Sequence, residues 1–291
     1  MNELKIGVVG SINVDVIYSA NRHPKKGETI FGDQYNIGNG GKGANQAVIL
    51  NALEDDVIFF GAVGNDILGL EARNNLGKKN LETMVEIKEG NTGMAIIRLA
   101  NNDNDIIVFK GANEKVDKSD IDQFLDKNPD LEIIVSQLEI NFEAIQYLIN
   151  RAYDLGIKVI LNPAPAIRLT PQLIEKVDFL IPNETEAEEI FQTKDFGEIV
   201  KAYQGKVIIT FGSKGVMYLD GDEAKIVPAE KISVVDTTGA GDSFVAGFTS
   251  GIYQGLSTKE AVQKGVRVAS ITCQFFGAQT SHRRVREVFR G

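Results

Sequence analysis

The segment Asp236–Phe244, with the sequence DTTGAGDSF, carries the residues best suited to phosphoryl-group chemistry. Small residues at the start of a helix leave backbone N–H groups open, and these groups bind an anion together with the positive end of the helix dipole. Asp242 lies in the same first turn, where it could accept a hydroxyl proton while the amides stabilise a phosphoryl group. An ordinary helix cap would explain Asp242 alone. Two glycines in a first turn cost helix stability, however, and therefore favour a binding site.

A second glycine-rich segment, Gly38–Ala47, places four glycines and Lys42 where a helix is expected to begin. It does not match a Walker A loop, because Gly43 follows Lys42 where that motif needs Ser or Thr. It is also a poor Rossmann fingerprint, because these glycines follow a hairpin-like segment and not the first buried strand. The glycine density favours a site where backbone N–H groups approach an oxygen-rich ligand over helix packing alone.

Further polar residues follow predicted strands, where ligands bind in open α/β sheets. Asn13 and Asp15 lie two residues apart, so in an extended chain they face one side and suit a polyol, although a turn is the simpler interpretation. Glu139 would lie at the carboxyl edge of the sheet, and a solvated loop acid is an equally good interpretation. Asn183 and Glu186 have the spacing of a capping box, and a helix cap is the preferred interpretation when this segment is considered alone.

Short apolar runs alternate with helical patterns along the chain, which predicts a doubly wound, mostly parallel sheet. The predicted buried strands are Ile6–Val9, Val57–Phe60, Ile133–Val135, Lys158–Leu161, Phe179–Ile181 and Val207–Thr210. The predicted helices are Gly43–Leu53, Asp66–Leu76, Glu143–Leu155, Glu184–Ile190, Gly239–Ile252 and Lys259–Phe275. Val14–Tyr35 and Thr92–Phe109 show period-two patterns and polar turns, so we expect antiparallel hairpins that could pair into a small accessory sheet.

The composition of the 291 residues, 43% hydrophobic and 24% charged, is that of a globular protein. A net charge of −9 opposes nucleic-acid binding. The single cysteine, Cys273, excludes an internal disulfide and multi-thiolate zinc sites, and only two histidines, His23 and His282, could serve a metal site or a Ser-His-Asp triad. No apolar run reaches the roughly 18 residues of a membrane span, and the first residues lack a secretory signal pattern, so we expect a cytoplasmic protein.

Taken in order, these segments resemble the PfkB family of carbohydrate kinases, and within it the ribokinase group, from Gly10–Asp15 to Gly277–Ser281. Gly40–Ala47 and Asp236–Phe244 are similar to the two family signatures. Similarity to intermediate motifs of the ribokinase group is found in Asn162–Ala166, which alone indicates a rigid turn, and in Pro182–Glu188 and Gly212–Gly215.

The resemblance implies a fold and an assembly. The fold is a three-layer α/β/α sandwich with a mostly parallel central sheet, formed by residues 1–291 as one kinase domain. Insertions at about 14–38 and 92–110 would form a small β-sheet lid. The same lid would serve as the interface of a homodimer.

The resemblance also implies a reaction, in which ATP with Mg²⁺ phosphorylates the 5-hydroxyl of D-ribose. By similarity, Asp242 would be the general base, and the amides of Gly239, Ala240 and Gly241 would form the anion hole. The sugar hydroxyls would be held by Asp242 together with Asn13, Asp15, Gly41, Lys42, Asn45 and Glu139. The nucleotide site would include Asn183, Thr210, Gly212, Lys214, Gly215 and Gly241, with Glu186 near the magnesium. A potassium ion that orders the anion-hole loop would be bound by Asp236, Thr238, Thr272, Phe275, Gly277 and Ser281.

Some residues depart from the pattern of the group. Val266 stands where an Asn or His usually lies near the nucleotide, and His282 follows Ser281 where relatives often have a proline. The basic tail with Arg283, Arg284, Arg286 and Arg290 is expected to be a solvated helix. Cys273 is expected to be a buried packing residue within the last predicted helix before this tail.

Three alternatives stay open at this point. The first is a kinase of 2-deoxyribose, a nucleoside or fructose, although Asn13 and Asp15 would be left underused by a sugar lacking a vicinal hydroxyl, which favours ribose. The second is a catalytically silent sugar-binding regulatory module, which would need no general base such as Asp242. The third, a dinucleotide-dependent oxidoreductase, lacks the glycine fingerprint after the first strand.

Overall fold

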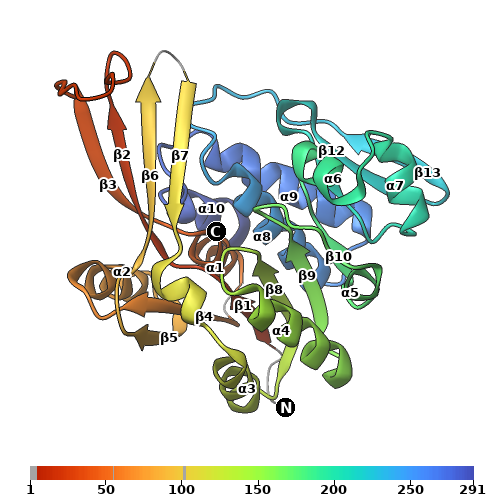
Figure 1. The fold of residues 1–291 in the computed structure, drawn as a ribbon. Coiled ribbons are helices and arrows are strands. Elements are labelled where there is room, and N and C mark those ends of the chain that lie inside the picture. Colours follow the sequence, from red (N-terminus) through yellow and green to blue (C-terminus); the bar gives the residue numbers. More distant parts are fainter. Residues whose placement is uncertain (1–4, 55, 101–102) are drawn as a thin grey trace.

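The structure, a computed structural model, describes residues 5–54, 56–100 and 103–291. Its central sheet has six parallel strands in the order β10-β9-β8-β1-β4-β5 (Figure 1). Their bounds are β1 (Lys5–Val9), β4 (Val57–Gly64), β5 (Glu82–Lys88), β8 (Leu131–Gln137), β9 (Lys158–Asn162) and β10 (Phe179–Leu180). The chain adds β4 and β5 on one side of β1 and then β8, β9 and β10 on the other. The carboxyl ends of β1 and β8 therefore meet at the topological switch point, where ligands bind in such sheets.

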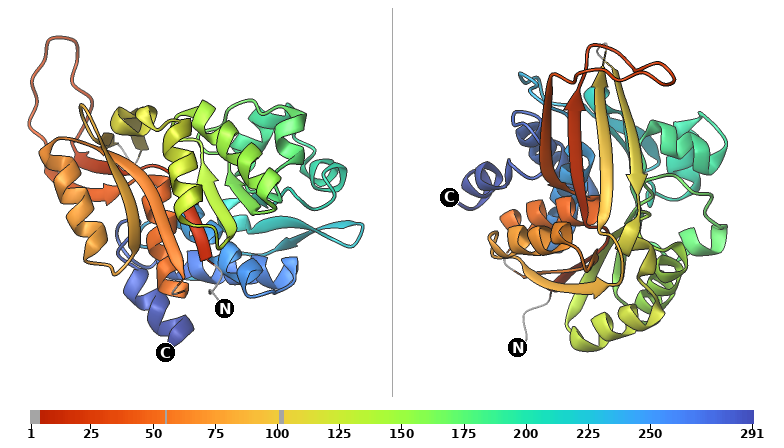
Figure 2. Two further views of the ribbon diagram at one scale, coloured as in Figure 1. Left: turned by 90° about the horizontal axis from the view of Figure 1, so that it is seen from below. Right: turned by 60° about the vertical axis from the view of Figure 1, so that its left-hand side comes forward.

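Helices cover both faces of this sheet, which confirms the predicted three-layer sandwich (Figures 1 and 2). Side chains alternate along β1, so that Ile6 and Val8 join one hydrophobic cluster and Val9 joins the other. The first cluster includes side chains from α1 (Lys42–Leu53), α2 (Ile67–Gly77), α8 (Ala240–Tyr253), α9 (Thr258–Thr272) and α10 (His282–Arg290). The second includes side chains from α3 (Lys118–Lys127), α4 (Phe142–Leu155), α5 (Pro171–Glu175), α6 (Glu184–Phe191) and α7 (Phe196–Ala202).

Four strands form a separate accessory sheet in the order β3-β2-β6-β7. They are β2 (Asn13–Ser19), β3 (Gln34–Gly40), β6 (Gly93–Ala100) and β7 (Asp103–Phe109). As predicted, β2–β3 and β6–β7 are antiparallel hairpins, and the two hairpins join through a parallel pairing of β2 with β6. The accessory sheet rises from the body of the molecule (Figure 1). Only one residue, Gly41, separates β3 from α1.

A third sheet, β11 (Ile209–Thr210), β12 (Val216–Asp220) and β13 (Glu223–Val227), follows β10 in the chain. The predicted strand Val207–Thr210 is thus shorter than expected, although Val207 forms a parallel bridge with Leu180 at the edge of the central sheet. Short 3₁₀ turns, η1 (Gly111–Lys115) and η2 (Gly212–Lys214), complete the elements.

The predicted helix Lys259–Phe275 was too long, because α9 ends at Thr272 and Cys273 is its carboxyl cap. The carbonyl oxygen of Cys273 accepts hydrogen bonds from the N–H groups of Val235 and Asp236, which turn the chain away from the helix axis. Cys273 is therefore half-buried at a helix end, and its prediction as a buried helix residue was wrong. None of the helices in the described ranges combines the length and apolar character that a membrane crossing requires.

Candidate active site

Asp242 lies in the first turn of α8 and is 6% exposed. Both of its carboxylate oxygens accept hydrogen bonds from α1: Asn45 Nδ2 lies 2.9 Å from Oδ2, and Gln46 Nε2 lies 3.0 Å from Oδ1. Helices α1 and α8 contact each other closely along the core. They therefore jointly orient the Asp242 side chain.

A set of buried amides surrounds Gln46. Its Nε2 also lies 3.1 Å from Asn162 Oδ1 at the end of β9, and its Oε1 accepts from Gln137 Nε2 at the end of β8 at 2.6 Å. Asn162 in turn donates to the carbonyl oxygen of Ile181. Gln46 and Gln137 are fully buried, and no role was predicted for either residue from the sequence. The one signal in the sequence was the position of Gln46 directly after Asn45, a predicted sugar-binding residue.

The glycines at the start of α8 shape the predicted anion hole. Gly239 has a φ of 76°, in the left-handed region, and a Cβ there would lie 2.6 Å from the Cβ of Ala278. A Cβ at Gly241 would meet no atom within 4 Å. The structure thus explains Gly239 by conformation and close packing, whereas Gly241 borders open space.

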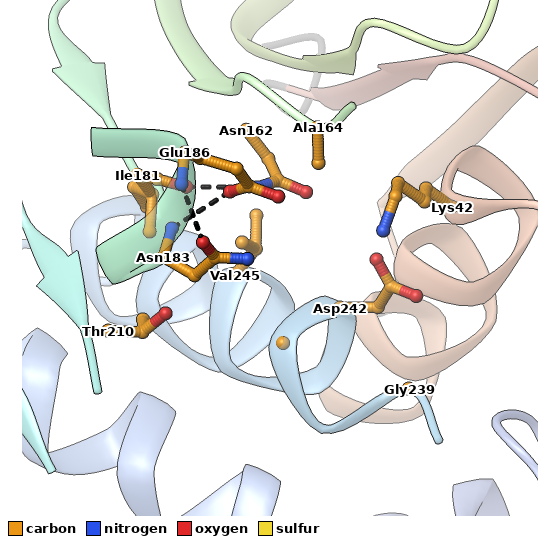
Figure 3. Close-up of a pocket in the computed structure, with 11 residues that line it drawn as sticks. Lys42, Asn162, Ala164, Ile181, Asn183, Glu186, Thr210, Gly239, Asp242 and Val245 are labelled. Carbon is orange, nitrogen blue, oxygen red and sulfur yellow. Dashed lines mark hydrogen bonds between the residues drawn. The ribbon is translucent and has the colours of Figure 1, made fainter. Parts of the chain in front are cut away.

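That open space is a cavity that joins the predicted sugar and nucleotide residues (Figure 3). Lys42 and Asp242 face each other at one end, and Asn183 and Thr210 lie at the other. The complete lining is Lys42, Asn162, Ala164, Ile181, Asn183, Glu186, Thr210, Gly239, Gly241, Asp242 and Val245.

The predicted sugar residues after β1 and β8 are anchored by hydrogen bonds at the switch point. Glu139 Oε2 accepts from Ser11 Oγ at 2.5 Å and from the backbone N–H of Lys42 at 3.0 Å. Asn13 Oδ1 accepts from Asn113 Nδ2 at 2.8 Å. Ser11 and Asn113 were not predicted, because their importance depends on contacts between segments about 100 residues apart in the chain.

Asp15 lies on β2, near the carboxylates of Glu139 and Asp242. The pKa of Asp15 is raised to about 7, mainly by burial and then by the charges of Glu139 and Asp242, while the nearby Lys42 lowers it. A Cβ at Gly40 would overlap the Asp15 carboxylate, so β3 must carry a glycine where it passes this side chain. Asp15 also lines a second cavity, beneath the accessory sheet, together with residues such as Asn39 and Gln279.

Lys42 is the cation of this acidic centre. Burial alone would lower its pKa, but the charges of Asp242, Glu139, Glu186 and Asp15 together raise it above the usual value. The ammonium group therefore stays charged in a half-buried position opposite Asp242. Such a cation can bind hydroxyl groups or phosphate oxygens.

At the nucleotide end, Asn183 and Glu186 form the capping box that their spacing predicted, with both reciprocal bonds at 2.8 Å. Burial is the main cause that raises the pKa of Glu186. Thr210 bridges Asn183 at the end of β11. The other predicted nucleotide residues, Gly212, Lys214 and Gly215, lie on and after η2 and are not part of the cavity lining.

The predicted cation-binding residues come together from two segments. Asp236 Oδ1 accepts from the N–H and hydroxyl of Thr238, and its Oδ2 accepts from the N–H of Gly277 at 2.9 Å. Thr272 Oγ1 and Ser281 Oγ lie 2.9 Å apart, and the Thr272 carbonyl accepts from the N–H of Phe275. Hydroxyl and carbonyl oxygens of this kind suit a hard cation. In the described ranges, no group of three or more His, Cys, Asp and Glu side chains could hold a metal ion.

Two departures from the pattern have a structural explanation. Val266 is 7% exposed and packs in the core cluster with side chains of α8. The basic tail forms α10, as expected, with Arg283 and Arg286 exposed. His282 bonds the Gln279 carbonyl, and burial is the main cause that lowers its pKa.

The comparison with known proteins assigns a family to this fold and site. Residues 3–284 match the pfkB family of carbohydrate kinases, and the chain belongs to that family. The chain is an ATP-dependent sugar kinase. It is 38% identical to the ribokinase of Lactococcus lactis, with 98% of this chain and 95% of the relative covered, and 35% identical to the deoxyribokinase of Salmonella typhi, with 96% and 95% covered. A structure of Arabidopsis thaliana ribokinase complexed with ribose and ATP superposes with a TM-score of 0.85 at 28% identity, and covers 99% of each chain.

Proposed function

We propose that this kinase phosphorylates D-ribose at O5, with Asp242 as the general base. The observation that carries the proposal is the position of the Asp242 carboxylate: it lies at the amino-terminal end of α8, faces Lys42, and borders one cavity with Asn183 and Glu186. Ribokinases among the relatives support ribose as the substrate.

In the proposed reaction, Asn13, Asp15, Lys42, Asn45, Glu139 and the Gly41 backbone hold the hydroxyls of the sugar. Asp242 accepts the proton of the 5-hydroxyl as the bond from O5 to the γ-phosphorus forms and the bond from that phosphorus to the ADP oxygen breaks. The N–H groups of Gly239, Ala240 and Gly241, at the positive end of the α8 dipole, stabilise the charge on the transferring group.

The nucleotide would be bound by Asn183, Thr210, Gly212, Lys214, Gly215 and Gly241. Glu186, a carboxylate of the cavity lining, would lie near the magnesium carried by ATP, which would neutralise phosphate charge. A potassium ion would be held by the residues around Asp236 and Ser281. Because these residues flank the first turn of α8, the ion would order the anion-hole loop.

We also propose that the chain acts as one kinase domain and forms a homodimer through the accessory sheet, which would act as a lid. Alternation along β2 places Asp15 on the face toward the site and Val16 on the opposite face. By register, Ile37 and Ile107 share the face of Val16, and both are more than half exposed. An apolar face of this kind favours association with a second copy. The cytoplasmic location stays a prediction.

A kinase of 2-deoxyribose is the second candidate, because a deoxyribokinase is among the relatives at 35% identity. Asn13 and Asp15 favour ribose. If they face vicinal hydroxyls, removal of one hydroxyl leaves a buried polar group without a partner, and discrimination at such sites is strong.

The test measures ADP release from MgATP with D-ribose, 2-deoxyribose, fructose and adenosine, in potassium and in sodium buffer. We expect turnover on ribose that depends on potassium and falls by about 10²–10⁴-fold in Asp242→Asn. Asp222→Asn, at an exposed turn, is the matched control and keeps full activity. Turnover confined to another sugar would transfer the specificity, and full activity of Asp242→Asn would refute the assigned base.

A further inference from the structure

Two chains of buried amides converge on Asp242. In the first, Gln137 Nε2 donates to Gln46 Oε1, and Gln46 Nε2 donates to Asp242 Oδ1. In the second, Gln279 Nε2 donates to Asn45 Oδ1, and Asn45 Nδ2 donates to Asp242 Oδ2. All four amide side chains are at most 7% exposed, so water does not compete for these bonds.

The carboxylate fixes the direction of both chains. An ionised carboxylate only accepts hydrogen bonds, so Gln46 and Asn45 must each turn an amide nitrogen toward Asp242. Each then presents its amide oxygen to the next side chain. Gln137 and Gln279 must therefore also point a nitrogen inward and leave an oxygen at the outer end.

The amide oxygens at the outer ends of the two amide chains lack hydrogen-bond partners. In the described ranges, three buried side-chain atoms have no hydrogen-bond partner: Gln137 Oε1, Gln279 Oε1 and Thr249 Oγ1. Two of the three are the outer oxygens of the two amide chains. A buried acceptor without a donor destabilises the folded state, so the orientation that serves Asp242 is kept at the expense of stability.

We propose that Gln46, Gln137 and Gln279 are positioning residues for the base. The proposal rests on the proposed role of Asp242. The amide chains fix the rotation of the carboxylate, so that the lone pair left free by Asn45 and Gln46 is directed at the sugar hydroxyl. Gln137 lies two residues before Glu139, so the end of β8 aligns the base with the acid that anchors Ser11 and Lys42.

The first test is Gln46→Met, which keeps the volume of the side chain but removes the donor to Asp242. We expect kcat to fall by about 10- to 100-fold with the KM for ATP unchanged, and the acidic limb of the kcat pH profile to move to higher pH. Asn51→Leu is the matched control. Asn51 is another buried amide of α1, and it donates to the Lys79 carbonyl, away from Asp242. It should lower the melting temperature and leave the acidic limb in place.

The second test is a double-mutant cycle of Gln46→Met with Gln137→Met, in which Gln137 acts only through Gln46. The double variant should lose no more of kcat than Gln46→Met alone. Losses that multiply, or a Gln46→Met enzyme with the wild-type pH profile, would overturn the proposal. Failure of the proposed function is seen separately, because it appears as full activity in Asp242→Asn whatever the amide variants do.

Discussion

Asp15 combines a buried carboxyl with two like-charged neighbours, so its ionisation should control sugar affinity near neutral pH. Its pKa in the free protein is about 7, whereas the ionised form is the better acceptor for sugar hydroxyls. Below pH 7, ribose binding must release the proton of Asp15. The Kd for ribose should therefore rise by up to about tenfold for each unit by which the pH falls. Calorimetric titrations of ribose between about pH 5.5 and 8.5 measure this. Asp15→Asn should bind weakly with a flat profile, and an equally steep profile in that variant would assign the effect to another group.

The same carboxyl should limit stability. Because the pKa of Asp15 is raised from 3.8 to about 7 on folding, the folded state holds its proton longer than the unfolded state. The free energy of unfolding therefore falls as pH rises from about 4 to 7. Without ligand, Asp15→Asn should melt at a higher temperature than the wild type at about pH 8, and the difference should vanish near pH 4. A difference independent of pH would contradict this assignment.

Two glycines at the start of α8, the cap residue Gly239 and Gly241 in the first turn, have different roles that alanine substitutions should distinguish. Gly239→Ala places a side chain at a φ of 76° and against Ala278, which should destabilise the fold by at least about 1–2 kcal/mol. Gly241→Ala meets no atom and should leave the melting temperature unchanged or raised. Its methyl group borders the cavity, so kcat/KM for ATP should fall. Thermal melts and steady-state kinetics of both variants provide the check, and equal melting temperatures would refute the distinction.

At the scale of helices and strands, the elements that could be predicted are those that local sequence patterns determine. The buried strands from Ile6–Val9 to Phe179–Ile181, the two hairpins and the capping box of Asn183 with Glu186 were recognisable from periodicity and spacing. Other elements were missed, among them β5, β12, β13, α3, α5 and α7, although α3 begins with a capping box formed by Asp117 and Asp120. The end of α9 was misplaced because bonds from Val235 and Asp236 decide it.

The site follows the same division. Motifs pointed to Asp242, Lys42 and Glu139, which the structure brings to one centre. Gln46, Gln137 and Gln279 were missed as parts of that centre. An isolated glutamine carries no local signal, and its function appears only when four separate segments meet around one carboxylate.

At the scale of the whole molecule, the proposed dimer predicts a change of mass on one substitution. Ile107→Lys places a charge on the apolar outer face of the accessory sheet and should convert a dimer into a monomer in sedimentation or light-scattering experiments. Ile226→Lys, at a similarly exposed isoleucine of β13, is the control and should leave the mass unchanged. A wild-type monomer, or a dimer that tolerates Ile107→Lys, would exclude this interface.

If the accessory sheet moves as the proposed lid, the single residue between β3 and α1 would make β3 turn as a lever. Gly41 would then be the pivot, and the seven residues of β3 would form an arm of about 23 Å. A rotation of about 10° at the pivot therefore displaces the far end by about 4 Å, while Lys42 on the short arm moves by a fraction of that. A spectroscopic label at the far end of β3, near Gln34, would therefore report in amplified form movements at the catalytic centre that are too small to follow directly.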